Sequence, residues 1–395
     1  MIKKIFSIIL ICCIGLSAVP VLADDNIRSG GTLNIPQNTV LDSLTAKSIM
    51  LMDATTGTVI FERNSDEKLP LASITKVMSM MIILDEIRNN NLSMDDIVTT
   101  SPYAASMGGS QVYLKEGEEF TVRDMLKAIA IHSANDCTVA VAEKVAGSES
   151  TFVDRMNEKA KALGMYNTYF LDCTGLTDDG HYSTAYDIAL MSSCVANDYP
   201  EILELTSIWH DTFRDGKFSL DNTNKLVGKY TGVTGLKTGF TTKAGYCLTT
   251  TAKRGLLSLV SVVLGTDTTD RRFDETSKLL DYGFANVELY SSNKKGEVVN
   301  KVKVIGGVQK DVDAIYKRDV NVTILKKDRS KLGRNIVLEN NLVAPIKKGD
   351  TVGRVEFKVD DQVIAKEEIV AKNDVKKASW IKRIFRAILR WLGIE

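Results

Sequence analysis

Leu71-Ala72-Ser73-Ile74-Thr75-Lys76-Val77 opens a long apolar segment and places a serine three residues before a lysine. Pro70 precedes the stretch, and apolar residues recur at helical spacing as far as Ile87. Proline is tolerated at or just before a first helical turn, so we expect Ser73 at the beginning of a buried helix. Residues three apart lie on one helix face, which places the Lys76 ammonium beside the Ser73 hydroxyl.

This pair predicts a specific chemistry. A serine is a weak nucleophile that needs an adjacent base, and burial among apolar side chains lowers the pKa of a lysine enough for its neutral amine to accept a proton. Ser73 is therefore predicted to be an acylated nucleophile and Lys76 its general base. The pattern alone is common, and taken by itself it is more often a helix-capping serine with a solvated lysine.

A second motif, Ser133-Ala134-Asn135, falls in the turn between two predicted helices. Ser133 can relay a proton toward a leaving amine, and the Asn135 amide can hold a substrate carbonyl. A serine and an asparagine in a turn are ordinary by themselves. They indicate a functional site only because they follow the Ser73 motif in the sequence.

A third motif, Lys237-Thr238-Gly239, lies on a predicted strand. Lys237 and Thr238 offer a cation and a hydroxyl to a substrate carboxylate, and Gly239 leaves room for substrate backbone beside the strand. The main-chain N–H groups of Ser73 and Phe240 are predicted to form the oxyanion hole. The three motifs in this order are those of β-lactamases and penicillin-binding proteins.

The pattern of elements predicts an α+β fold. A strand pair is followed by a helical middle section, then by three strands and a closing helix, and the first and last strands are expected to share one antiparallel sheet. The expected strands cover 47–53, 58–63, 235–240, 245–251 and 256–264, and the expected helices cover 121–131, 136–145, 150–163, 185–195, 200–208 and 270–284.

The chain divides into four parts. Residues 1–23 resemble a cleavable signal peptide, with two lysines, an apolar run and a small-residue cleavage site. Residues 24–287 form the predicted catalytic domain. Short alternating runs make 288–372 a small all-β domain, and 373–395 is predicted to be an amphipathic helix. An uncleaved N-terminal membrane anchor remains the alternative for the first part.

The tail, residues 376–395, carries six basic residues and one acidic residue, with apolar side chains on the opposite helix face. It is too short and too charged to span a bilayer, and it is predicted to lie on an anionic membrane surface. Docking on the chain's own β domain is the alternative. The formal net charge of zero argues against a nucleic-acid partner. We expect an exported protein, held peripherally at the outer face of the cytoplasmic membrane.

Beyond the three motifs, four stretches resemble the low-molecular-mass penicillin-binding proteins, which are serine-type D-alanyl-D-alanine carboxypeptidases. They are Lys68 to Lys76, Asp172 to Leu176, His181 to Ala185 and Gly235 to Cys247. The resemblance covers nearly everything after residue 45. It implies a transpeptidase-like domain, an antiparallel sheet with a helical subdomain, that removes the last D-alanine from peptidoglycan stem pentapeptides and is acylated by β-lactams.

The resemblance also implies that an arginine of the closing helix grips the terminal carboxylate, with Arg272 as the best match and Arg271 as the alternate. Phe240 departs from the family pattern, in which some relatives place a histidine or a small hydroxyl residue after Lys-Thr-Gly. The fit of substrate near the leaving D-alanine is therefore left open.

Two other functions are considered. A serine β-lactamase shares the motifs, but the Glu-x-x-Leu-Asn loop that commonly activates its deacylating water is not found. A catalytically silent peptidoglycan-binding scaffold would have no use for a nucleophile with its base. No cofactor is expected, and no metal-ligand spacing occurs in the sequence. The four cysteines after residue 23 are expected to be buried thiols, although export would permit disulfides.

Overall fold

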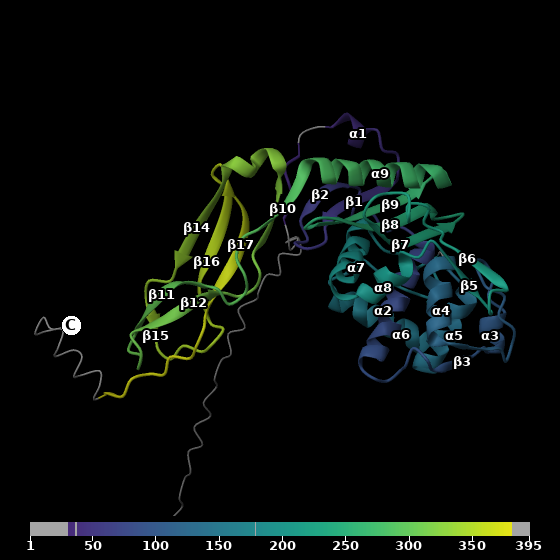
Figure 1. Ribbon diagram of the computed structural model, residues 1–395, viewed down its shortest axis with the longest axis horizontal. Helices are drawn as coiled ribbons and strands as arrows, with labels where there is room; N and C mark the ends of the chain where they lie inside the picture. Colours follow the sequence, from purple (N-terminus) through teal and green to yellow (C-terminus); the bar gives the residue numbers. More distant parts are fainter. Residues whose placement is uncertain (1–30, 36–37, 178, 381–395) are drawn as a thin grey trace, which may run out of the picture.

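The computed structural model describes residues 31–35, 38–177 and 179–380, which form a domain of helices around a sheet and an elongated β domain beside it (Figure 1). The expected signal peptide, residues 1–23, lies outside the described residues, as does most of the expected tail helix, 373–395. The α+β class predicted from the sequence is confirmed.

The first domain is built on a five-stranded antiparallel sheet with the strand order β2-β1-β9-β8-β7. The N-terminal hairpin therefore pairs with strands from the other end of the domain, as the sequence predicted. The strands are β1 (Ser48–Asp53), β2 (Val59–Arg63), β7 (Val233–Thr241), β8 (Gly245–Arg254) and β9 (Leu257–Thr266).

Both faces of this sheet are covered, because successive side chains of a strand point to opposite faces. In β1, Ile49 and Leu51 pack into a cluster with helix α9 (Thr269–Asn286). Met50 and Met52 pack instead with the helices of the other side. Figure 1 shows α9 along one face of the sheet, with the short α1 on the same side, and α2 to α8 on the other face.

The helical layer is organised around α2 (Lys76–Arg88), whose residues from Lys76 to Leu84 are all buried. A 3₁₀ turn, Ala72–Thr75, leads into α2, and a π-helical turn, Ala128–His132, follows α4. The other helices are α1 (Thr39–Asp42), α3 (Pro102–Ala105), α4 (Val122–Lys127), α5 (Asn135–Ala146), α6 (Glu149–Ala162), α7 (Ala185–Asp198) and α8 (Pro200–Thr206).

Two small hairpins interrupt the middle section, which the sequence had suggested was entirely helical. One pairs β3 (Ile97–Thr99) with β4 (Glu119–Thr121), and the other pairs β5 (His210–Phe213) with β6 (Phe218–Asp221). Strands of three or four residues carry too little alternation to be recognised. The second hairpin also turns through left-handed residues that are not all glycines, Arg214 and Asp215 among them.

The β domain follows α9 directly. Its six-stranded sheet has the order β14-β16-β17-β12-β11-β15, and a separate pair joins β10 to β13. The strands are β10 (Val287–Ser291), β11 (Val298–Ile305), β12 (Asp311–Tyr316), β13 (Asn321–Leu325), β14 (Leu332–Leu338), β15 (Leu342–Val343), β16 (Thr351–Val359) and β17 (Gln362–Ala371), with a 3₁₀ helix at Lys326–Lys331.

The described part of the tail belongs to the β domain. Val375 and Lys377 form β-bridges with Ile346 and Gly307, so the segment after residue 372 begins as extended chain where a helix was expected. None of the helices in the described part of the chain is both long enough and apolar enough to cross a bilayer.

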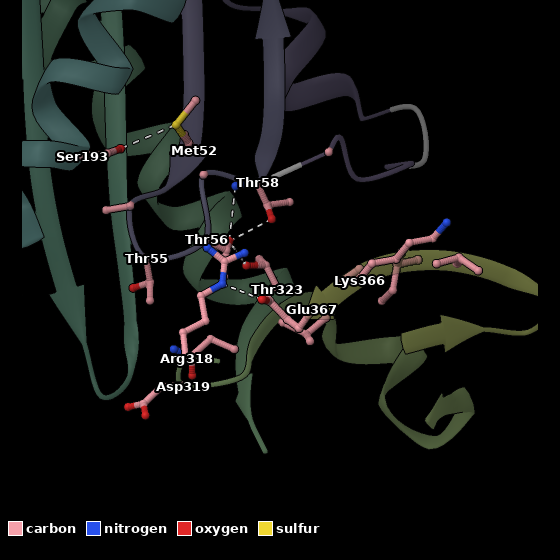
Figure 2. Close-up of a pocket in the computed structure, with 18 of the residues that line it drawn as sticks. Met52, Thr55, Thr56, Thr58, Ser193, Arg318, Asp319, Thr323, Lys366 and Glu367 are labelled. Carbon is pink, nitrogen blue, oxygen red and sulfur yellow. Dashed lines mark hydrogen bonds and ion pairs between the residues drawn. The ribbon is translucent and has the colours of Figure 1, made fainter. Parts of the chain in front are cut away.

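The two domains meet through a buried polar contact. The Thr323 hydroxyl donates to the Asp53 carboxylate at 2.6 Å and lies 2.5 Å from the Thr56 hydroxyl. Figure 2 shows the cavity of about 630 Å³ beside this contact, where Arg318 pairs with Glu367. The candidate catalytic residues do not line this cavity, so it is separate from the site described next.

Candidate active site

The nucleophile candidate sits in the 3₁₀ turn that leads into α2. Lys76 Nζ donates to Ser73 Oγ at 2.8 Å, the contact that the three-residue spacing predicted. Ala72, directly before the serine, has a left-handed φ of +47° although it is not a glycine. Such conformations cost free energy and persist where surrounding contacts impose them. The turn that presents Ser73 is therefore held by its neighbours.

Lys76 is a buried amine, with 0% of its surface exposed. Burial lowers its pKa from 10.5 to about 7, while the charges of Asp172 and Asp136 oppose the shift. A lysine with this pKa is largely neutral just above pH 7, in the form that can accept a proton. The structure thus gives Lys76 the electrostatic property that a general base needs.

A loop from residue 172 to residue 177 closes over this pair. The main-chain oxygen of Thr174 accepts a hydrogen bond from Lys76 Nζ at 2.7 Å. Gly175 lies against the turn Ala72–Thr75, which carries Ser73 and is called the nucleophile turn below. A Cβ at Gly175 would overlap the main-chain oxygen of Ala72 and come within 2.7 Å of Thr75 Oγ1. Lys76 is thereby fixed between Ser73 on one side and Thr174 on the other.

Strand β7 borders the nucleophile turn on the other side. A Cβ at Gly239 would lie 2.6 Å from the main-chain oxygen of Leu71 and 3.3 Å from the nitrogen of Ser73. Glycine at this position is therefore required for the strand to approach the helix. The main-chain nitrogen of Ser73 consequently lies beside the strand that carries Phe240, as an oxyanion hole built from both would need.

Lys237 and Thr238 occupy the same strand. The Thr238 hydroxyl donates to Thr223 Oγ1 at 2.7 Å, and Lys237 Nζ donates to the Thr238 carbonyl at 3.2 Å. Lys237 is fully buried, and burial, with the neighbouring charges of Lys76 and Arg272, lowers its pKa. Among the described residues, Lys237 makes no ion pair with a carboxylate. A bound anion would relieve the mutual repulsion of these three bases.

Ser133 and Asn135 flank the entry into α5. Ser133 adopts a left-handed φ of +67°, and Asn135 donates through Nδ2 to the Gly108 carbonyl at 2.7 Å. Ser133 Oγ and Asn135 Oδ1 are both buried, and neither has a hydrogen-bond partner within the described chain. Buried polar atoms are rarely left unpaired, so these two are available to a ligand.

The remaining candidates lie at the edge of this group. Phe240 is 52% exposed and stacks on Tyr246, with 4.4 Å between ring centroids. Arg272 is buried and donates to the Gly239 carbonyl at 3.1 Å, and burial lowers its pKa. Arg271, the alternate, is exposed and pairs with Asp267. Of the two arginines, only Arg272 contacts the Lys-Thr-Gly strand.

The structure therefore unites the Ser73 and Lys237 motifs around Lys76 and adds contacts that sequence reasoning missed. The Thr174 carbonyl and the Thr223 hydroxyl are the main additions. The Asp172 to Leu176 stretch had been singled out by resemblance, but nothing in it indicated contact with Lys76. An aspartate two residues before a threonine and three before a glycine does signal a tight turn, and this turn is observed.

A serine in the turn that opens a helix, hydrogen-bonded to a lysine three residues on and packed against an antiparallel strand that bears Lys-Thr-Gly, is typical of the serine enzymes that recognise penicillin. The fold and the site place this protein in that class. Comparisons with known families show which family within this class the chain resembles. The sequence model of the D-alanyl-D-alanine carboxypeptidase family, peptidase S11, matches residues 35–268, and that of the penicillin-binding protein 5 C-terminal domain matches residues 284–377. The chain belongs to the D-alanyl-D-alanine carboxypeptidase family.

Individual relatives agree with this assignment. The chain is 43% identical over 350 residues to the D-alanyl-D-alanine carboxypeptidase DacF of Bacillus subtilis, covering 88% of this chain and 90% of that protein. It is 33% identical to DacC of Escherichia coli, over 89% and 90% of the two chains. The structure of penicillin-binding protein 5 from Haemophilus influenzae matches with a TM-score of 0.82 and 31% identity, over 87% of this chain and all of that one.

A structure with a bound β-lactam is also similar. Penicillin-binding protein D2 of Listeria monocytogenes, in its ampicillin-bound form, matches 63% of this chain and all of its own, with 35% identity and a TM-score of 0.58. The matched share of this chain is close to the length of the predicted catalytic domain.

Proposed function

We propose that this protein removes the terminal D-alanine from peptidoglycan stem pentapeptides through an acyl-enzyme on Ser73. The observation that carries the proposal is the hydrogen bond of 2.8 Å between Ser73 Oγ and a buried Lys76 whose pKa is lowered to about 7. Family membership supports the reaction class. The same nucleophile would be acylated by β-lactams, whose strained amide resembles the scissile bond.

In the proposed acylation, neutral Lys76 accepts the Ser73 proton as Ser73 Oγ attacks the carbonyl carbon of the penultimate D-alanine. The N–H groups of Ser73 and Phe240 stabilise the oxyanion of the tetrahedral intermediate. Ser133 relays a proton to the nitrogen of the leaving D-alanine. Collapse of the intermediate breaks the peptide bond, and water then hydrolyses the ester and frees Ser73.

The proposed carboxylate site is formed by Lys237, Thr238 and Arg272. A terminal carboxylate beside Lys237 would favour the charged ammonium, which burial otherwise disfavours. The Arg272 guanidinium already donates to main-chain carbonyls, which favours a contribution through its charge over direct contact with substrate. Asn135 is assigned the substrate carbonyl, and Gly239 lets the substrate backbone lie beside β7.

The test uses purified protein truncated after residue 380, incubated with a stem pentapeptide while free D-alanine is measured. Ser73→Ala is expected to abolish D-alanine release and covalent labelling by a fluorescent penicillin. Ser207→Ala, the same change at an exposed serine of the catalytic domain, is the control and should retain both. Release of D-alanine by Ser73→Ala would reject the nucleophile, and rapid turnover of penicillin by the unmodified protein would favour a β-lactamase instead.

We also propose that the protein is exported through residues 1–23 and lies at the outer face of the cytoplasmic membrane, attached by residues 376–395. The basic and apolar residues of that segment, which a helix would place on opposite faces, support attachment to anionic lipid. Co-sedimentation with vesicles containing phosphatidylglycerol tests this: residues 24–395 should bind and residues 24–380 should not. Equal sedimentation of the two proteins would contradict the attachment.

A further inference from the structure

The loop that contacts Lys76 has no regular secondary structure, and one carboxylate holds it together. Asp172 Oδ1 accepts hydrogen bonds from the Thr174 nitrogen at 2.7 Å, the Thr174 hydroxyl at 2.8 Å and the Gly175 nitrogen at 2.5 Å. Asp172 Oδ2 accepts from the Thr177 nitrogen at 2.8 Å. Four donors from three residues thus converge on a single side chain, and together they define the conformation of the loop.

This arrangement decides the direction of the Thr174 carbonyl. In a trans peptide group the C=O of one residue and the N–H of the next lie in one rigid plane and point in opposite directions. Asp172 holds the Gly175 N–H, so the Thr174 C=O of the same peptide group points away from Asp172. It points at Lys76 Nζ, 2.7 Å away. The carboxylate therefore orients the group that holds the lysine without touching the lysine itself.

A histidine anchors the same loop to the nucleophile turn. His181 Nδ1 accepts from the Leu171 nitrogen at 3.1 Å, which leaves Nε2 as the donor to Thr75 Oγ1 at 2.8 Å. Thr75 Oγ1 in turn donates to the Ala72 carbonyl at 2.8 Å. His181 is only 1% exposed. The residue next to Asp172 is thereby tied to the turn that presents Ser73.

We propose that Asp172 is a positioning residue for the reaction: it folds the loop 172–177 so that the Thr174 carbonyl holds the Lys76 amine against Ser73. This inference rests on the proposed function, in which Lys76 is the base. Asp172 takes no part in bond making or proton transfer. Its loss should therefore reduce the rate of acylation without abolishing it, whereas loss of Ser73 abolishes acylation.

The charge of Asp172 has a second, measurable effect. The titratable groups that influence the pKa of Lys76 are Cys173, Asp172 and Asp136, and Lys237 is a further neighbour. Burial raises the pKa of the Cys173 thiol well above its usual value, so Cys173 is uncharged at neutral pH. Although burial opposes it, the hydrogen bonds that the loop donates to the carboxylate hold the pKa of Asp172 below its ordinary value. Asp172 is therefore ionised at pH 7 and favours the protonated form of Lys76.

The experiment measures the second-order rate constant for labelling by a fluorescent penicillin between pH 5 and pH 9. Asp172→Asn removes the charge and keeps one oxygen for the three hydrogen bonds that Oδ1 accepts, while an NH2 group replaces Oδ2, the acceptor of the Thr177 nitrogen. Asp172→Ala removes the acceptors as well. Asp179→Asn is the matched control, because Asp179 is an exposed carboxylate seven residues away that pairs with Lys243. Each rate is divided by the folded fraction from a thermal melt.

We expect Asp172→Asn to reach nearly the plateau rate of the unmodified protein, with the midpoint of its acid limb shifted to lower pH. The shift has this sign because removing the carboxylate destabilises the protonated lysine. Asp172→Ala should lose about 10- to 100-fold of the plateau rate, the scale of a misplaced catalytic group. The Asp179→Asn profile should superimpose on that of the unmodified protein.

An unshifted acid limb in Asp172→Asn, or a plateau for Asp172→Ala within about threefold of the unmodified protein, would overturn the inference; that margin is far below the loss that misplacement causes. If Asp172→Ala shows no folding transition, the acid limb of Asp172→Asn decides alone. Failure of the unmodified protein to label at all would instead overturn the proposed function. The two failures are thus distinguishable.

Discussion

Replacing Gly175 by alanine should damage both the stability and the chemistry of this protein. Gly175 has a φ of +81°, where an alanine costs about 1–2 kcal/mol. Its Cβ would also overlap the main-chain oxygen of Ala72 and lie 2.7 Å from Thr75 Oγ1. Overpacking against such neighbours costs about 1–3 kcal/mol more. The expected total loss is about 2–5 kcal/mol in the free energy of unfolding.

A second glycine separates the two contributions. Gly147 ends helix α5 with a φ of +79°, and a Cβ there would meet nothing within 4 Å. Gly147→Ala therefore incurs the backbone cost alone, about 1–2 kcal/mol. Guanidinium chloride denaturation of both variants, followed by circular dichroism, gives the difference between them. That difference, expected at about 1–3 kcal/mol, measures the contact between the loop and the nucleophile turn.

The same pair of variants tests the link between this contact and catalysis. Penicillin labelling per folded molecule should fall about tenfold or more for Gly175→Ala, because the Thr174 carbonyl and the Ser73 turn are displaced together. Gly147→Ala should label at the rate of the unmodified protein. Equal stability losses in the two variants, together with unchanged labelling by Gly175→Ala, would refute the claim that this loop supports the nucleophile.

Three further predictions follow from buried groups. Acylation should fall about tenfold for each pH unit below the Lys76 pKa of about 7, since only the neutral amine accepts a proton; a rate independent of pH between 5 and 7 would contradict the assignment. Thr323→Val should lower the free energy of unfolding by about 1.5–3 kcal/mol, because the buried Asp53 Oδ2 loses the hydroxyl that donates to it. Thr212→Val, at an exposed strand position, should change the free energy of unfolding by less than about 0.5 kcal/mol, and chemical denaturation of both variants measures the difference. The cysteines after residue 23 should resist iodoacetamide at pH 7.5 until the protein is unfolded. Burial raises the pKa of each thiol, that of Cys194 to about 11, so that little reactive thiolate is present. Rapid labelling of the native protein, measured by mass spectrometry, would contradict this prediction.

Features that depend on neighbours in the sequence were predictable. Thr121 caps the beginning of α4, where the expected helix 121–131 begins, and Gly147 ends α5 close to the expected end of the helix 136–145. The contact between Lys76 and Ser73 also follows from helical geometry alone. Each of these rests on residues within one helical turn of each other, where spacing fixes the geometry.

The pairing of the first and last strands was predicted, but individual contacts between distant segments were not predictable. The Thr174 carbonyl lies 98 residues from Lys76 in sequence, and no local pattern connects the two. The left-handed conformations of Ala72 and Ser133 were equally unpredictable. Glycine and asparagine are the residues that indicate a positive φ in a sequence, and neither position has one of them. The contact of Arg272 with the Gly239 carbonyl shows the same limit: the resemblance named the residue but not its partner.

The base strength of Lys76 is best understood as a product of packing. Two positions without side chains, Gly175 and Gly239, let a loop and a strand approach the nucleophile turn from different segments of the chain. Their approach removes water from Lys76, and this desolvation is the largest cause of its lowered pKa. A side chain at either glycine would separate the segments, and water admitted to the gap would return the amine toward its protonated form. The size of the side chain at positions 175 and 239, and not only the charges near Lys76, should therefore set the pH at which Ser73 becomes reactive.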